Sequence, residues 1–161
     1  MRTLIAGFGN VFFSDDGFGP AVVRSLETNA FPPGVVVRDF GTGGMHLALE
    51  MCAGYDLVVI VDAVARDDAP GTLFAIEAKE CGAHSVPDAH AMDASAVLAL
   101  FESMARQLEC KRPKVLVVGS VPETTAEGME LSSVVRAAIP ACRKLVRALT
   151  TDLMTTTGAK T

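Results

Sequence analysis

Residues 2–23 read RTLIAGFGNVFFSDDGFGPAVV, and this stretch decides what kind of fold the chain can adopt. A short apolar run ends in the glycine turn GFGN. The acidic pair Asp15 and Asp16 then begins a segment in which apolar residues recur at helical spacing. A strand, a glycine turn and a helix form the opening unit of many α/β folds. We therefore predict a buried strand over residues 2–7 and a helix over residues 16–29.

The same stretch argues against a phosphate-binding loop. A helix N-terminus carries partial positive charge and free N–H groups, which attract anions. Here the carboxylates of Asp15 and Asp16 already meet those groups and would repel a pyrophosphate. The pattern G-x-G-x-x-G also fails, because its last position is Phe12. An acidic pair after a first strand indicates a cation site or acid–base chemistry instead.

Length and composition predict one compact domain. The chain has 161 residues, of which 50% are hydrophobic and 20% are charged, and this suits a single globular core. We expect the domain to cover residues 1–150 and to be followed by a frayed polar tail over residues 151–161. We expect the protein to be a monomer.

Charge and hydropathy exclude two classes of partner. The net charge is −5 and Lys and Arg form no run, which argues against nucleic acid. No apolar stretch approaches the roughly 20 residues that cross a bilayer, which argues against a membrane protein. The first residues lack a signal-peptide pattern, so a cytoplasmic location is expected.

The remaining pattern alternates strands and helices. Apolar runs predict strands over residues 35–39, 57–61, 72–77 and 115–118, and helices over residues 45–53, 93–108 and 132–149. The connection before residue 72 is too short for a crossover helix, so that strand is predicted to be antiparallel to its neighbour. The fold class is therefore α/β. We predict a three-layer sandwich with a five-stranded, mostly parallel, twisted sheet, one antiparallel strand, and helices on both faces.

Ligands of open α/β sheets bind outside the carboxyl ends of the strands, and three candidate ligands converge there. Asp16 follows the first strand, Asp62 ends the third, and His90 lies in a loop that can return to the same edge. Two carboxylates and one imidazole suit Zn, Mn, Ni or Fe and leave positions open for a substrate. We predict Asp16, Asp62 and His90 as metal-binding and catalytic residues.

These residues also have structural explanations. Asp62 could cap a backbone N–H, Asp16 could stabilise the helix dipole, and Asp15 could be the N-cap of the helix. A lone histidine is often only a surface residue. The same edge is rich in glycine, which permits the close approach of an extended peptide. We predict a substrate cleft bordered by Asn10, Asp39, Gly41, Thr42 and Gly43.

Five blocks of sequence resemble the hydrogenase maturation endopeptidases. They are the opening G-F-G-N-x-x-x-S-D-D-G-F-G-P, the segment D-F-G-T-G-G-M, the strand end V-D-A, the loop of His90, and V-G-S-V-P-E. The resemblance covers nearly all of the chain, from Leu4 to about Leu149. The order and spacing of the blocks make it specific, and the first block is the strongest.

The resemblance implies a concrete activity. Members of this family remove a short C-terminal extension from the precursor of the large subunit of a [NiFe] hydrogenase, after the nickel–iron centre has been inserted. The nickel-recognition positions of the family match Asp16, Asp62 and His90 of this chain. The nickel would be supplied by the precursor, so the free site is expected to be empty or to hold another divalent cation.

Two other functions stay open at this point. A nonproteolytic nickel-binding carrier could use the same ligands, and it would bind metal without cleaving a precursor. A small nucleotide-binding or flavin-binding α/β protein would bind its cofactor at the turn around Asn10, although the acidic pair argues against it. Titration with nickel and with nucleotides separates the two.

Overall fold

The structure, a computed structural model of the chain, describes residues 1–27, 30–78 and 93–158, with side chains as far as Thr151. His90 lies outside the described residues. In the described part of the chain, no helix is both long enough and apolar enough to span a membrane.

Five strands form one sheet: β1 (Thr3–Phe8), β2 (Val35–Gly41), β3 (Leu57–Ala63), β4 (Leu73–Glu77) and β5 (Lys114–Ser120). Their order across the sheet is β2-β1-β3-β5-β4. Every neighbouring pair is parallel except β4 and β5, which are antiparallel. The predicted sheet, including its antiparallel strand, is therefore confirmed.

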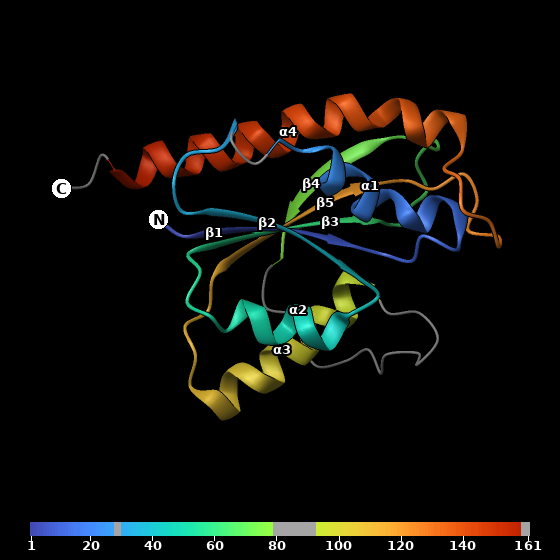
Figure 1. The fold of residues 1–161 in the computed structure, drawn as a ribbon. Coiled ribbons are helices and arrows are strands. Elements are labelled where there is room, and N and C mark those ends of the chain that lie inside the picture. Colours follow the sequence, from blue (N-terminus) through green and yellow to red (C-terminus); the bar gives the residue numbers. More distant parts are fainter. Residues whose placement is uncertain (28–29, 79–92, 159–161) are drawn as a thin grey trace.

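Helices cover both faces of the sheet. They are the 3₁₀ helix η1 (Ser14–Gly17) and the α-helices α1 (Phe18–Ser25), α2 (Gly44–Met51), α3 (Ala94–Leu108) and α4 (Ser133–Gly158). Helices α1 and α4 lie on one face and α2 and α3 on the other, as Figure 1 shows. The three-layer α/β fold predicted from the sequence is confirmed.

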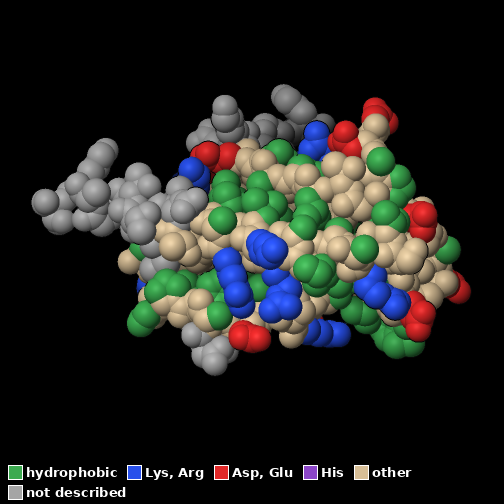
Figure 2. Space-filling model, turned by 90° about the horizontal axis from the view of Figure 1, so that it is seen from above, with side chains coloured by type: hydrophobic (Ala, Val, Ile, Leu, Met, Phe, Trp, Pro, Cys, Tyr) green, Lys and Arg blue, Asp and Glu red, His purple; other side chains and the backbone are tan. Residues whose placement is uncertain are grey.

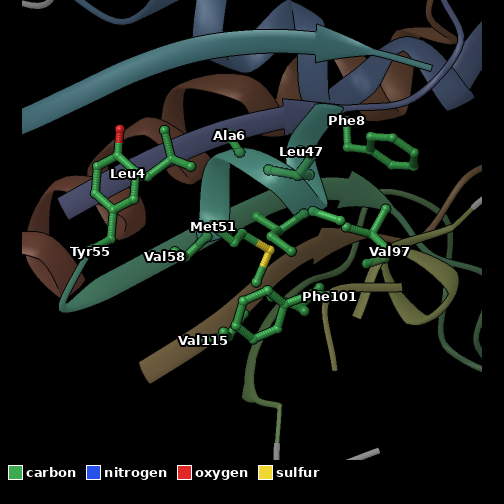
Figure 3. Packing of buried hydrophobic residues seen from close by; sticks show 14 of the residues in the cluster. Leu4, Ala6, Phe8, Leu47, Met51, Tyr55, Val58, Val97, Phe101 and Val115 are labelled. Carbon is green, nitrogen blue, oxygen red and sulfur yellow. The ribbon is translucent and has the colours of Figure 1, made fainter. Parts of the chain in front are cut away.

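The central strands are apolar on both sides because each side faces a helix layer. In β3, Val58 and Ile60 belong to the core beneath α2 and α3, whereas Val59 and Val61 belong to the core beneath α1 and α4. Figure 3 shows the first of these cores, where residues of β1, α2 and α3 interdigitate. Because side chains alternate along a strand, Asp62 continues the series that faces α2 and α3.

The first helix differs from the prediction of one helix over residues 16–29. The acidic pair falls in the 3₁₀ helix η1, and the α-helix starts only at Phe18. Helix α1 ends at Ser25 because Leu26 is extended, with φ −79° and ψ 129°. The hydroxyl of Ser25 donates to the carbonyl of Val22 (2.6 Å), a local bond that competes with continuation of the helix.

The last helix ends later than the sequence predicts. The prediction ends it at residue 149, but α4 continues to Gly158. The sequence between Pro140 and Gly158 contains neither glycine nor proline, so no residue type interrupts the helix. The hydroxyl of Thr150 donates back to the carbonyl of Val146 (2.8 Å). The residues predicted as a frayed tail therefore continue the helix as far as Gly158.

Candidate active site

Two glycines bring the start of α1 directly onto the carboxyl ends of β1 and β3. A Cβ at Gly19 would overlap the carbonyl oxygens of Phe8 and Val61. Gly9 has a φ of 135°, which favours glycine, and a Cβ there would overlap the carbonyl oxygen of Asp16. This close packing fixes η1, with its two aspartates, at the edge where the sequence predicts the site.

Asp15 is fully buried and its carboxylate accepts four hydrogen bonds. The backbone N–H groups of Glu123, Thr124 and Ser132 donate at 2.8, 3.1 and 2.7 Å, and the hydroxyl of Ser132 donates at 2.9 Å. Burial acts to raise the pKa of Asp15, but these bonds together hold it below its usual value. Asp15 is therefore not an N-cap; it ties η1 to the loop after β5.

We call residues 10–17 the acidic turn. Most backbone N–H groups of this turn donate hydrogen bonds to acceptors within the protein. The N–H of Asn10 donates to the carboxylate of Asp16 (2.7 Å), and the N–H of Phe12 donates to the side-chain oxygen of Asn10 (3.0 Å). Backbone carbonyls accept from Phe13, Ser14, Asp15 and Asp16. Because these N–H groups already donate to protein acceptors, they are not available to bind a phosphate. This gives a structural reason for the argument from the sequence against a phosphate-binding loop.

Asp16 is half-buried in η1, beside the end of β1. Its Oδ2 accepts the hydrogen bond from Asn10, and this bond orients the carboxylate. Burial raises the pKa of Asp16 above its usual value, and the bond from Asn10 opposes the rise only in part. Asp16 therefore has a fixed position and holds a proton more readily than an exposed aspartate.

Asp62 is buried, with 1% of its surface exposed, at the end of β3. Its Oδ2 accepts a hydrogen bond from the backbone N–H of Ala94 (3.1 Å), the first residue of α3. Burial, reinforced by the negative charges of Asp16 and Asp93, raises the pKa of Asp62 to about 8. The bond from Ala94 lowers this pKa but does not outweigh the burial.

The negative charge of Asp16 acts on Asp62. The charge of Asp16 disfavours ionisation of Asp62, so the two groups are close enough to interact. Near neutral pH, Asp62 holds a proton in most molecules, because its pKa is about 8. Such a pair can donate and accept a proton, or it can release the proton and bind a cation.

The third predicted ligand cannot be compared with these two. His90 falls in residues 79–92, which are outside the described ranges. Within those ranges, no group of three His, Cys, Asp or Glu side chains is placed to hold a metal ion. The structure therefore brings Asp16 and Asp62 together, and the assignment of His90 stays a prediction.

The predicted cleft residues lie on two adjacent segments: Asn10 in the acidic turn, and Asp39, Gly41, Thr42 and Gly43 at the end of β2 and just after it. The segments are joined where the N–H of Gly9 donates to the carbonyl of Gly41 (2.9 Å). The Asp39 carboxylate is paired with Arg24 (2.6 Å) and accepts from the N–H of Gly41 (2.8 Å). These residues share the edge that carries Asp16, and their contact with a substrate stays a prediction.

A pocket of about 270 Å³ opens beside the first turn of α3. Its wall includes Asp93 and Ala94 at the start of α3, and Ile76 and Glu77 from β4. The N–H of Ala94 also donates to Asp62, so one wall residue of this pocket contacts that carboxylate. None of the predicted cleft residues lines it.

Two contributors to the site were missed from the sequence. Asp93 is the N-cap of α3, where its side chain accepts from the N–H of Ala96 (2.9 Å), and its charge also acts on Asp62. An aspartate just before an apolar helical run is a readable signal for this role. Ser132, which donates twice to Asp15, carries no such signal.

The chain is an α/β protein in which Asp16 and Asp62 lie at the carboxyl edge of the sheet. The family model described as hydrogenase maturation protease matches residues 20–148. The chain therefore belongs to the hydrogenase maturation proteases, a family of peptidases, as the resemblance of its sequence blocks implies.

Individual relatives agree with this assignment. The hydrogenase 2 maturation protease of Escherichia coli is 33% identical over 92% of this chain and 91% of its own length. The coenzyme F420 hydrogenase subunit delta of Methanothermobacter thermautotrophicus is 30% identical over 89% and 90%. The structure of the hydrogenase maturating endopeptidase HybD from Escherichia coli superposes with a TM-score of 0.78, at 28% identity, over 94% of this chain and 93% of that one.

Proposed function

We propose that this protein removes the C-terminal extension from the precursor of a nickel–iron hydrogenase large subunit. We further propose that it recognises, through Asp16, Asp62 and His90, the nickel that the precursor carries. Membership of the maturation protease family supports the first part. The nickel belongs to the substrate, so the free protein is a recognition surface rather than a resident metalloenzyme.

One observation carries the proposal: a buried carboxylate and a half-buried one interact at the carboxyl edge of the sheet. A buried aspartate whose pKa is about 8 is unfavourable in its charged form unless a cation or a donor compensates it. A metal carried by the precursor would supply that compensation. Binding would displace the proton of Asp62 and leave two ionised carboxylates facing the metal.

The same groups suit peptide hydrolysis. A peptidase needs a group that takes a proton from the attacking water and a group that gives one to the leaving amine. A pKa of about 8 lets Asp62 hold or release a proton near neutral pH, while the N–H of Ala94 orients its carboxylate. The metal on the substrate would position one peptide bond in the cleft, which lowers the entropic part of the barrier.

The end of β2 would border the bound peptide. Gly41 has a φ of 52° and open space where a Cβ would stand, so an extended chain can approach its backbone closely. Asp39 is held by Arg24 and therefore presents a fixed wall beside this opening. The precursor would lie between this segment and the acidic turn.

A cleavage assay on nickel-loaded precursor tests the proposal. The variants are Asp16→Asn, Asp62→Asn and His90→Gln, which remove charge or ligand capacity with little change in shape. Each is expected to lower the cleavage rate by about 100-fold or more, the usual scale for an acid–base group. The matched control is Asp68→Asn, an aspartate that is 50% exposed and pairs with Arg66 at 3.4 Å.

Two outcomes contradict the proposal in different ways. Full activity in all three site variants would remove Asp16, Asp62 and His90 from the reaction. Tight nickel binding by the wild-type protein without any cleavage would favour the nonproteolytic carrier. Precursor without nickel serves as the second control and should not be cleaved.

A further inference from the structure

Three large apolar side chains stand exposed in the acidic turn and in the segment that is hydrogen-bonded to it. Phe12 is 60% exposed, Phe13 is 39% exposed and Met129 is 73% exposed. They come from segments far apart in the sequence, one after β1 and one after β5. We call these three residues the apolar ridge.

Backbone hydrogen bonds hold the two segments of the ridge side by side. Phe13 and Gly128 form an isolated parallel bridge, and the N–H of Gly128 donates to the carbonyl of Phe12 (2.9 Å). The N–H of Ser14 donates to the carbonyl of Gly128 (2.7 Å). Met129 follows Gly128 directly, so all three ridge side chains project from one joined strip of backbone.

The strip contains a strained residue. Ser14 has a φ of 47°, which a residue with a Cβ seldom adopts, and its hydroxyl is held by the carbonyl of Ala126 (2.9 Å). Gly128 is needed opposite, since a Cβ there would approach the Ser14 hydroxyl to 2.9 Å. Backbone strain that surrounding bonds maintain is often found at functional sites.

The ridge is also fixed relative to Asp16. The N–H of Asp16 donates to the carbonyl of Phe13 (3.1 Å), and the N–H of Phe13 donates to the carbonyl of Asn10 (3.2 Å). The N–H of Asn10 in turn donates to the Asp16 carboxylate. A chain that is held at Asp16 therefore has the ridge as its immediate neighbour.

Acidic residues surround the ridge on its second segment. Glu123, Glu127 and Glu130 are exposed there, and Arg136 lies 3.8 Å from Glu130. Figure 2 shows hydrophobic, acidic and some basic side chains intermixed at the end of the molecule where these loops lie in Figure 1. Such a surface is complementary to a peptide that carries both apolar and basic side chains.

We propose that the apolar ridge docks a segment of the precursor that carries apolar side chains flanked by Lys or Arg. The proposal rests on the proposed function for the identity of the partner. Two features favour this occupant: the ridge continues directly into the turn that carries Asp16, and the glutamates beside it match basic side chains. Large aromatic residues that become buried at an interface usually contribute most to affinity.

The test measures the dissociation constant of the nickel-loaded precursor and, in parallel, KM and kcat for its cleavage. The double variant Phe12→Ser/Met129→Ser should raise the dissociation constant and KM by about 10-fold or more and leave kcat unchanged. The control is Leu108→Ser, a side chain that is 58% exposed at the far end of α3, and it should change neither. Equal melting temperatures of all variants verify that the ridge residues are not needed for folding.

A second pair of substitutions tests the charge complementarity. Glu127→Gln/Glu130→Gln should weaken precursor binding at low salt and make it less dependent on salt, because screened attraction is lost. An unchanged dissociation constant in both double variants overturns the proposal. A wild-type dimer that dissociates into monomers in the ridge variant also overturns the proposal, because the ridge would then bind a second copy of the chain.

The binding measurement separates this proposal from the proposed function. If the wild-type protein binds the precursor without cleaving it, and the ridge variant weakens that binding, the ridge is confirmed while the proteolytic proposal fails. If the wild-type protein does not bind the nickel-loaded precursor at all, the ridge proposal is wrong.

Discussion

The carboxylate of Asp62 accepts a hydrogen bond from the backbone N–H of Ala94, and this bond joins the end of β3 to the start of α3. Two carboxylates therefore accept hydrogen bonds from N–H groups of the first turn of α3, because Asp93 also accepts from Ala96. The N-terminus of a helix favours a negative charge, but the burial of Asp62 outweighs this benefit and raises its pKa to about 8. The group is therefore unfavourable for stability when it is charged.

The first prediction concerns stability against pH. The folded pKa of Asp62 is about 8 and the ordinary value is 3.8, so between these values the folded state binds the extra proton. The contribution of Asp62 to the free energy of unfolding should therefore be most favourable below pH 4. It should fall as the pH rises to 8 and then stay constant. Each pKa unit corresponds to about 1.4 kcal/mol, so the loss is on the order of 6 kcal/mol.

The variant Asp62→Asn should remove this pH dependence. Its free energy of unfolding relative to wild type should grow steadily between pH 4 and pH 8, as measured by urea denaturation at a series of pH values. Asp68→Asn, at an exposed position, is the control for the removal of one acidic side chain. A constant difference between Asp62→Asn and wild type across this range would show that the Asp62 carboxyl ionises normally in the folded protein.

The second prediction concerns Asp15, whose pKa is shifted in the opposite direction. Asp15→Ala leaves the part-buried N–H donors of Glu123, Thr124 and Ser132 without their acceptor, and each such loss costs up to about 1–3 kcal/mol. We expect a total destabilisation of about 3–5 kcal/mol, together with reduced cleavage, because Asp16 would lose its anchoring. Ser132→Ala removes one bond to Asp15 and should cost only about 1 kcal/mol.

Chemical denaturation of both variants checks this order. The stability that Asp15 contributes should be present above its ordinary pKa and should be lost as pH falls toward its lowered folded value. If Asp15→Ala were no more destabilising than Ser132→Ala, the loop after β5 would be held by other contacts.

The third prediction concerns Gly19 in α1. A change of glycine to alanine inside a helix ordinarily stabilises it by about 1 kcal/mol. Gly19→Ala should instead destabilise the protein, because the new Cβ overlaps the carbonyl oxygens of Phe8 and Val61. Ala21→Gly, in the same helix, should behave ordinarily and cost about 1 kcal/mol. Thermal melting that shows Gly19→Ala at or above wild-type stability would refute the close packing of α1 on the strand ends.

Much of the fold could be predicted because its signals are local. The unbroken run from Leu57 to Val61 indicates a strand that is covered on both faces, and the short connection after Asp62 indicates an antiparallel β4. The position of Asp16 and Asp62 at one edge followed from the rule that parallel strands end at the same edge of a sheet. These inferences needed no knowledge of distant contacts.

What could not be predicted depends on contacts across the chain. The role of Asp15 is set by Ser132 and its neighbours, and no local pattern marks that partnership. The late start of α1 depends on the positive φ of Ser14, which the loop after β5 maintains. Helix propensity alone favours a helix that begins at Asp15, but hydrogen bonds to the loop after β5 outweigh this preference.

The hydrogen bonds between the acidic turn and the loop after β5 have a consequence for biosynthesis. Ribosomes deliver Asp15 long before Ser132, and the two are separated by 117 positions. Until that later stretch has left the exit tunnel and β5 has docked, the turn that presents Asp16 lacks its anchors. A nascent chain that has not yet reached Ser132 therefore lacks the donors that hold Asp15 in the folded protein.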